Sequence, residues 1–110
     1  NYHMLVERSG HISLSVSERV NFSRPSIDVT FINIAEIFAD KATGIILTGA
    51  NEDGAYGLAA IDRNGGNTIV QNPKEAHMDI MPLAALNLTP NSAQFTLDEI
   101  IQHLSLHFTD

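Results

Sequence analysis

The chain has 110 residues, of which 44% are apolar, and a formal net charge of −7 at pH 7. This length is enough for one small domain with its own core, and the acidic balance argues against nucleic acid or an anionic membrane as the main partner. The sequence contains no cysteine, which excludes disulfides, thiolate zinc sites and cysteine nucleophiles. No apolar run approaches the roughly 20 residues that span a bilayer, and no signal peptide is visible. We therefore expect a cytoplasmic protein that is not inserted in a membrane.

The beginning of the chain predicts a small β-hairpin followed by a helix. Residues 3–7 and 11–16 are strand-like runs separated by a turn that contains Gly10, a pattern typical of a hairpin. A helix should begin near Ser26, because its hydroxyl group can accept hydrogen bonds from the first-turn N–H groups, and should end within residues 40–43. Four apolar residues at helical spacing predict its buried face: Phe31, Ile34, Ala35 and Phe38.

The rest of the chain alternates short strands with helices. A strand, a helix and a strand in this order form a right-handed parallel crossover unit. The sequence therefore predicts an α/β fold, in which a mainly parallel, Rossmann-like sheet is flanked by helices and carries a small β-hairpin at its start. We expect strands at residues 45–47, 68–71 and 93–97. We expect helices at about 54–63, with core contacts from Leu58 and Ile61, and from Pro82 to Leu86. A last helix should open at residues 96–99, with the apolar residues Ile100, Ile101, Leu104 and Leu106.

The turn at residues 49–54 is the best candidate for part of a functional site, because open α/β sheets bind ligands at the carboxyl ends of their strands. Asp53 directly precedes the next helix, where an aspartate is commonly an N-cap that accepts backbone N–H bonds. Its carboxylate could instead orient a histidine for nucleophilic catalysis, and it has enough lone pairs for both roles. The backbone N–H of Ala50 could stabilise a developing oxyanion, or bind water as in any turn.

Other catalytic and binding motifs are weak or missing. His103 and His107 have the i, i+4 spacing that can hold a metal on a helix. No Glu lies between them and no third ligand is indicated, so we expect surface histidines and no metal site. The sequence has no G-x-S-x-G elbow for a serine nucleophile. Gly49 and Gly54 have the glycine spacing of a phosphate-binding loop, but the Lys-Ser/Thr pair does not follow them.

Four stretches, in order, carry a resemblance to a known family. The longest is G-I-I-L-T-G-A-N-E-D-G-A-x-G-L at residues 44–58, and the others are R-P-S-I-D-V-x-F at 24–31, G-G-x-T-I-V-Q at 65–71 and M-P-x-A-A at 81–85. Together they resemble the CheB family of chemotaxis receptor methylesterases over residues 3–88. The resemblance implies an α/β catalytic domain with a Ser-His-Asp triad and no cofactor. It also implies hydrolysis of γ-glutamyl methyl esters on chemoreceptors and, in many members, deamidation of receptor glutamines.

The same resemblance implies roles for particular residues. It places the triad aspartate at Asp53 and a backbone N–H of the oxyanion hole at Ala50. Ala50 stands where the family usually has Met, a departure that keeps the backbone donor, and Ile80 stands where Gly is common before the M-P motif. The family's serine and histidine would lie upstream of Asn1. We therefore interpret residues 1–110 as the C-terminal part of a methylesterase catalytic domain and expect the isolated chain to be inactive.

Two functions from different classes remain open from the sequence. In the first, the parent protein is a methylesterase whose partner is the methylated chemoreceptor; typical family members also carry a receiver domain that gates access to the site. In the second, the chain is a non-catalytic α/β interaction or regulatory module that keeps the fold, because the Ala50 departure and the missing triad members leave room for it. A small-molecule-binding domain that uses the same loop is a weaker third option, since no phosphate motif supports it.

Overall fold

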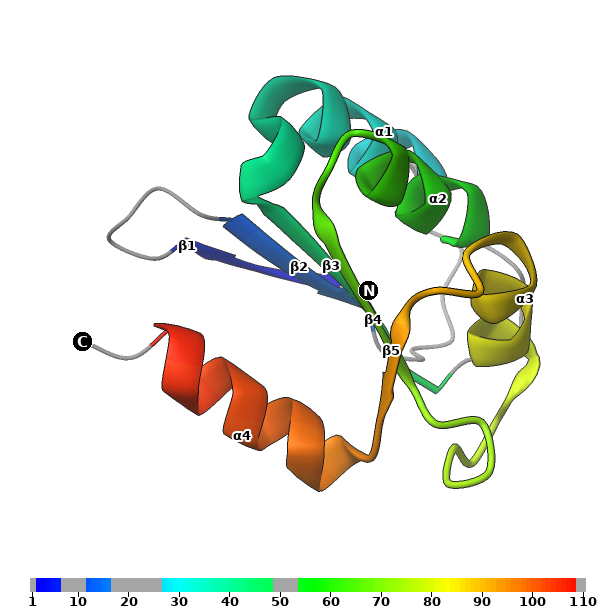
Figure 1. Cartoon of the computed structure of the whole chain (residues 1–110). Helices are drawn as coiled ribbons and strands as arrows, with labels where there is room; N and C mark the ends of the chain where they lie inside the picture. The colour runs from blue at the N-terminus through cyan, green and yellow to red at the C-terminus, as the bar shows by residue number, and fades with distance from the viewer. Residues whose placement is uncertain (1, 7–11, 17–26, 49–53, 109–110) are drawn as a thin grey trace.

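The computed structural model describes residues 2–6, 12–16, 27–48 and 54–108. These contain a sheet of five strands in the order β1-β2-β3-β4-β5 (Figure 1). β1 (Tyr2–Val6) and β2 (Ile12–Val16) are antiparallel, while β2, β3 (Ala42–Ile46), β4 (Asn67–Gln71) and β5 (Ala93–Phe95) run parallel to one another. The predicted α/β class, the mainly parallel sheet and the antiparallel pair at the start are confirmed.

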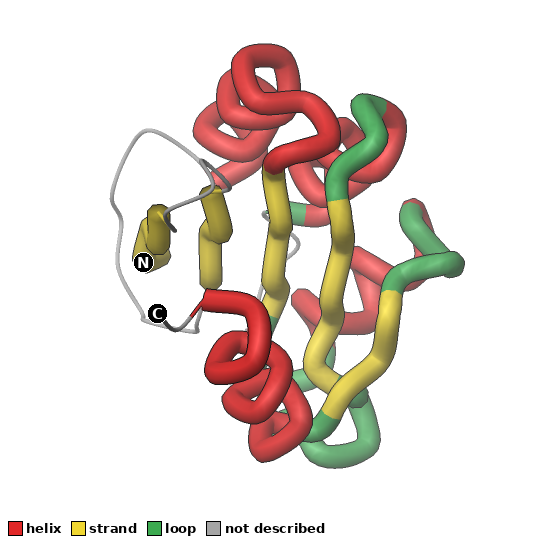
Figure 2. Tube along the Cα trace, turned by 60° about the vertical axis from the view of Figure 1, so that its left-hand side comes forward, coloured by secondary structure: helices red, strands yellow, loops and turns green. Residues whose placement is uncertain are grey.

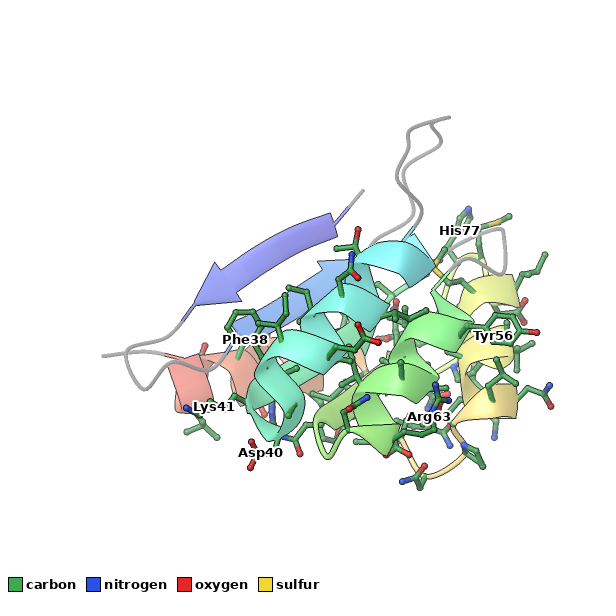
Figure 3. The ribbon with its side chains drawn as sticks, turned by 90° about the horizontal axis from the view of Figure 1, so that it is seen from above. Phe38, Asp40, Lys41, Tyr56, Arg63 and His77 are labelled. Atoms are coloured by element: carbon green, nitrogen blue, oxygen red, sulfur yellow. The ribbon has the colours of Figure 1, made fainter. Side chains whose placement is uncertain are left out.

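The helices cover the two faces of the sheet unequally. α1 (Ile27–Phe38), α2 (Ala55–Arg63) and α3 (Ile80–Leu88) lie on one face, and α4 (Leu97–Phe108) lies against the other (Figures 1 and 2). α1 and α2 pack side by side (Figure 3). None of the helices among the described residues is long and apolar enough to cross a membrane.

The alternation of side chains along β3 and β4 divides the core into two clusters. Ile46 and Val70 are register partners and belong to the larger cluster with α1, α2 and α3, whereas Ile45 and Ile69 are register partners in the smaller cluster with α4. A strand covered on both faces needs apolar side chains at successive positions, which explains the uninterrupted Ile45-Ile46 pair. In the larger cluster, the helices contribute Phe31, Ala35, Leu58, Ala60, Ile61, Met81 and Ala85.

Gly44 lies inside β3, although the sequence pattern placed it at the boundary of the strand. The strand begins two residues earlier than Gly44, at Ala42, after a short 3₁₀ turn at Ala39–Lys41. A Cβ atom on Gly44 would come within 2.7 Å of the Ile61 side chain and 2.8 Å of the Leu58 side chain. Glycine at this position therefore lets α2 pack directly on the strand.

α2 ends in a Schellman motif, in agreement with the helix predicted at about residues 54–63. Gly65 has a left-handed φ of 90°, its N–H donates to the Asp62 carbonyl at 3.0 Å, and the N–H of Gly66 donates to the Ile61 carbonyl at 2.9 Å. These bonds satisfy carbonyl groups that the end of a helix leaves unpaired. The chain then turns directly into β4.

The structure corrects the predicted apolar face of α4. Ile100 is buried and Leu104 is half-buried against the sheet, but Ile101 and Leu106 are exposed by 54% and 80%. The start of the helix agrees with its sequence, because Thr96 and Glu99 form a reciprocal capping box: the Glu99 N–H donates to Thr96 Oγ1 at 3.1 Å, and the Thr96 N–H donates to Glu99 Oε1 at 2.8 Å.

Candidate active site at the carboxyl edge of the sheet

The carboxyl ends of the parallel strands define one edge of the sheet. β3, β4 and β5 end at Ile46, Gln71 and Phe95. Figure 3 shows Tyr56 and His77 toward one end of the molecule and Asp40 and Lys41 toward the other. Because Asp40 and Lys41 precede β3, the end with Tyr56 and His77 is the carboxyl edge, where sites of parallel α/β folds are found.

The two predicted site residues, Ala50 and Asp53, lie outside the described residues. The segment that contains them, residues 49–53, is predicted to be a turn and lies between two segments that the structure does describe. Thr48 follows the carboxyl end of β3, and Gly54 leads into α2. Both ends of the turn are therefore fixed at the carboxyl edge.

Gly54, rather than Asp53, is the N-cap of α2, which corrects the prediction that Asp53 takes this position. Gly54 is buried and has a left-handed φ of 103°, and its carbonyl accepts the first helical bond, from the Leu58 N–H at 2.9 Å. Glycine adopts this conformation without steric cost. Gly54 itself has no side-chain acceptor.

Thr48 ties the end of β3 to the segment that enters α3. Its hydroxyl donates to the Met78 carbonyl at 3.0 Å, and the Met78 N–H donates back to Thr48 Oγ1 at 2.7 Å. The backbone N–H of Thr48 donates to the side-chain oxygen of Gln71 at 2.9 Å. Three hydrogen bonds thus hold the residue from which the turn at 49–53 departs.

Gln71 and Glu75 continue this connection across the edge. The Gln71 side-chain N–H donates to Glu75 Oε2 at 3.0 Å, and the same oxygen accepts the backbone N–H of Leu97, at the start of α4, at 2.8 Å. Glu75 is in reach because Asn72 starts a tight turn: its side chain accepts the Lys74 N–H at 3.0 Å, and its carbonyl accepts the Glu75 N–H at 3.0 Å. We call Thr48, Gln71 and Glu75 the edge network.

The sequence pattern does not predict the edge network. Asn72-Pro73 signals a turn after β4, and this signal could have predicted that the chain reverses there. Nothing in the pattern indicates that Gln71 meets a residue 23 positions earlier, or that Thr48 meets one 30 positions later. Such partners are set by the packing of parallel strands.

The histidines that the structure describes do not form a metal centre. His103 on α4 packs against Phe95, with ring centroids 5.8 Å apart and planes inclined at 48°, and His77 is exposed before α3. Within residues 2–6, 12–16, 27–48 and 54–108 there is no group of three or more His, Asp or Glu residues that could hold a metal ion. His103 therefore has a packing role against β5.

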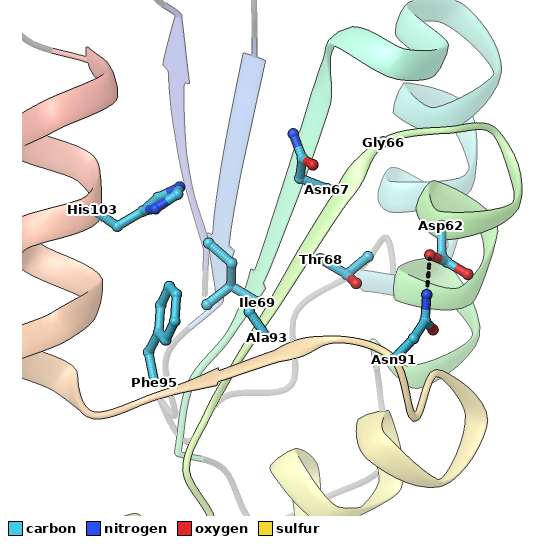
Figure 4. A pocket seen from close by; sticks show the side chains of 9 residues that line it. All are labelled: Asp62, Gly66, Asn67, Thr68, Ile69, Asn91, Ala93, Phe95 and His103. Carbon is cyan, nitrogen blue, oxygen red and sulfur yellow. Dashed lines mark hydrogen bonds between the residues drawn. The ribbon is translucent and has the colours of Figure 1, made fainter.

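A separate groove of about 350 Å³ extends from the amino end of β4 toward α4 (Figure 4). Among its lining residues, Asn91 donates to Asp62 at 3.1 Å. The lining residue Thr68 accepts a hydrogen bond from Ser92 at 2.8 Å. None of the edge network residues lines this groove, so it is no part of the candidate site. Its lining residues are Asp62, Gly66, Asn67, Thr68, Ile69, Asn91, Ala93, Phe95 and His103.

The family model described as CheB methylesterase matches residues 1–104. The chain belongs to the CheB methylesterase family. It is 48% identical over 102 residues to a relative from Leptospira interrogans, a match that covers 93% of this chain and 53% of that relative. It is 37% identical over 107 residues to the Cereibacter sphaeroides protein named protein-glutamate methylesterase/protein-glutamine glutaminase 2, covering 94% of this chain and 29% of that protein.

The fold agrees with that of a solved member of this family. The crystal structure of the Thermotoga maritima CheB methylesterase catalytic domain matches with a TM-score of 0.69 at 24% identity, over 94% of this chain and 55% of that one. The chain therefore spans about half the length of that catalytic domain and of the Leptospira relative.

Proposed function

We propose that the protein containing this chain hydrolyses glutamate γ-methyl esters on chemotaxis receptors, and deamidates receptor glutamines, in the cytoplasm. The observation that carries the proposal is membership of the CheB methylesterase family over residues 1–104. The name of the Cereibacter relative joins the same two reactions. Both replace a leaving group on a γ-carbonyl by water, so a single acyl-transfer site can serve them.

The proposed mechanism uses a serine and a histidine supplied from outside residues 1–110. The histidine takes the serine proton as the serine oxygen attacks the γ-carbonyl, and then gives that proton to the departing methanol or ammonia. Water hydrolyses the acyl-enzyme through the same base. The carboxylate of Asp53 holds the histidine in the tautomer that accepts the proton, and the backbone N–H of Ala50 donates to the oxyanion of the tetrahedral intermediates.

Two features of the chain support this assignment of roles. The turn that contains Ala50 and Asp53 is bracketed by Thr48 and Gly54 at the carboxyl edge of the sheet. An oxyanion donor on the backbone is compatible with Ala50 in place of the family's usual Met, because the donor belongs to the peptide group.

The role of Asp53 is tested by Asp53→Ala in the full-length protein, with methylated receptor as the substrate. We expect the turnover number to fall about 10³-fold to 10⁴-fold, the scale on which loss of a triad acid acts. Asp62→Ala is the matched control, because Asp62 lies on α2 but away from the carboxyl edge and bonds Asn91; its turnover number should stay near that of the wild type. An unchanged turnover number in Asp53→Ala contradicts the proposed role. A wild-type protein with no esterase activity favours the non-catalytic module instead.

A further inference from the structure

Three segments of the carboxyl edge are joined through the side chains of the edge network. Thr48 follows β3, Gln71 ends β4, and Glu75 lies in the loop after β4 and reaches the start of α4 at Leu97. A fourth segment, at Met78, enters α3 and is bound by the Thr48 hydroxyl. The hydrogen bonds therefore fix the ends of neighbouring strands relative to one another.

Each side chain in this connection has one orientation that satisfies all its bonds. The Thr48 hydroxyl uses its donor and an acceptor on the carbonyl and N–H of the same residue, Met78. The Gln71 side-chain oxygen accepts the Thr48 N–H, and its nitrogen donates to Glu75. If the amide were flipped, its nitrogen would face the Thr48 N–H and its oxygen would face the Glu75 carboxylate, and both bonds would be lost. Gln71 is 6% exposed, whereas Thr48 is half-buried and Glu75 is exposed, so water reaches the network mainly at Glu75.

We propose that Thr48 and Gln71 are positioning residues of the esterase site: they fix the point from which the turn at 49–53 leaves the sheet. This proposal rests on the proposed function and names residues that act through the turn rather than on the substrate. The bonded N–H of Thr48 is two residues before Ala50, the proposed oxyanion donor. Catalytic groups must be held within a fraction of an ångström of their productive geometry. The hydrogen bonds of Thr48 and Gln71 supply this restraint at the residue that precedes the segment 49–53.

A purely structural role would have a different signature. Loss of a bond that only stabilises the fold lowers the folded fraction and leaves the turnover number of each folded molecule unchanged. Loss of a positioning bond misplaces the catalytic groups, so kcat falls while KM, which reports binding of the receptor, changes little. The two roles are separated by steady-state kinetics on protein whose folded fraction is measured in parallel.

The first test compares Thr48→Val with Thr68→Val in the full-length protein. Both substitutions replace a threonine hydroxyl by a methyl group; Thr48 follows β3, and Thr68 lies in β4. The Thr68 hydroxyl bonds Ser92 at 2.8 Å in the interior, away from the carboxyl edge. We expect Thr48→Val to lower kcat roughly tenfold to hundredfold, the scale of a small misplacement of catalytic groups. Thr48→Ser keeps the hydroxyl and should stay near wild type. The proposal is overturned if Thr48→Val keeps the wild-type kcat, or if Thr68→Val lowers kcat equally.

The second test reverses the amide–carboxylate pair. Gln71→Glu keeps an acceptor for the Thr48 N–H but sets two carboxylates against each other, so kcat should fall. Adding Glu75→Gln restores a donor–acceptor pair with residue 71 but loses the acceptor of the Leu97 N–H, so Glu75→Gln alone is the reference and the double variant should have a higher kcat than Gln71→Glu. Failure of this recovery overturns the role of the pair. This test still decides the question if Thr48→Val does not fold, because each replacement side chain has nearly the shape of the original.

Asp53→Ala, measured alongside, separates this proposal from the proposed function. If Asp53→Ala abolishes turnover but Thr48→Val and Gln71→Glu do not lower it, the positioning proposal fails and the esterase assignment stands. If the wild type has no esterase activity, amide hydrogen exchange over residues 48–54 is the readout. Faster exchange in Thr48→Val than in Thr68→Val supports the anchoring of the turn, and equal exchange overturns it.

Discussion

Gly66 is a position at which the backbone leaves no room for a side chain. A Cβ atom there would lie 2.6 Å from the carbonyl oxygen of Ala42 and 3.2 Å from that of Ala39. These atoms belong to the backbone at the start of β3, so they cannot move aside without shifting the strand. At Gly44 the nearest atoms are the ends of the Leu58 and Ile61 side chains, which can change rotamer.

This difference predicts unequal costs for two glycine substitutions. We expect Gly66→Ala to lower the free energy of unfolding by roughly 2 to 3 kcal/mol, the upper part of the range for overpacked sites. Gly44→Ala should cost about 1 kcal/mol, near the lower end of that range, because its neighbours are flexible. Urea unfolding of both variants measures the difference. An equal loss of unfolding free energy in the two variants would contradict this prediction, because it would mean that the backbone at Ala42 shifts as readily as a side chain changes rotamer.

Single residues also mark the limit of what the sequence could predict about the site. The motif at residues 44–58 pointed to Asp53 and Ala50, and no described residue tests their roles. The position of Asp53 favours an N-cap, but the N-cap of α2 is the next residue, Gly54, because helix boundaries predicted from a pattern are uncertain by a residue or two. Thr48 and Gln71 were in the motifs, but their bond joins positions 23 apart, a distance that local patterns do not encode.

At the scale of single elements, α4 begins with a capping box whose two bonds are separable. Thr96→Ala removes the hydroxyl that accepts the Glu99 N–H, leaving a first-turn donor without its partner. We expect a loss of about 1 kcal/mol in the free energy of unfolding, the typical value for an N-cap. Thr96→Ser is the control, because serine caps as well as threonine. Urea unfolding that does not distinguish the two variants would show that water replaces the hydroxyl at no cost.

Helical periodicity predicted the buried faces of α1 and α2 better than that of α4. Phe31 and Ala35 in α1 and Leu58 and Ile61 in α2 are all buried, as expected. In α4 the apolar residues spread over a wide arc, and only part of that arc meets the sheet. A sequence gives the direction of an apolar face, but not how much of it another element covers.

At the scale of the whole molecule, the order of elements was enough to predict a parallel α/β sheet, since the alternation of strands and helices allows few other topologies. It did not reveal how unequally the two faces are covered. Three helices pack on one face around the larger cluster, while on the other face α4 packs on a cluster with Ile45 and Ile69 from the strands. The size of the smaller cluster depends on where α4 packs against the sheet, and this position is set by tertiary contacts.

The unequal faces predict different local stabilities for α2 and α4. In α2, five of nine residues are buried, so opening this helix exposes part of the larger core. In α4, Ile100 is buried, while Leu97, Ile101 and Leu106 are exposed, so opening it exposes less apolar surface. Regions with few buried apolar contacts open at lower free energy than the rest of a protein. We therefore expect the amide hydrogens of α2 to exchange more slowly than those of α4, as measured by native-state hydrogen exchange.

Two core variants serve as controls for the exchange experiment. For each of them, the free energies of opening of α2 and α4 are compared with those of the wild type. Leu58→Ala, in α2, should lower the opening free energies of α2 and α4 together, since loss of the larger core promotes unfolding of the whole sheet. Ile100→Ala should accelerate exchange in α4 and leave α2 nearly unchanged, because α4 can detach from the sheet while the larger cluster stays intact. Equal protection of the two helices in the wild type, or equal effects of Ile100→Ala on both, would show that α4 is as firmly bound to the molecule as α2.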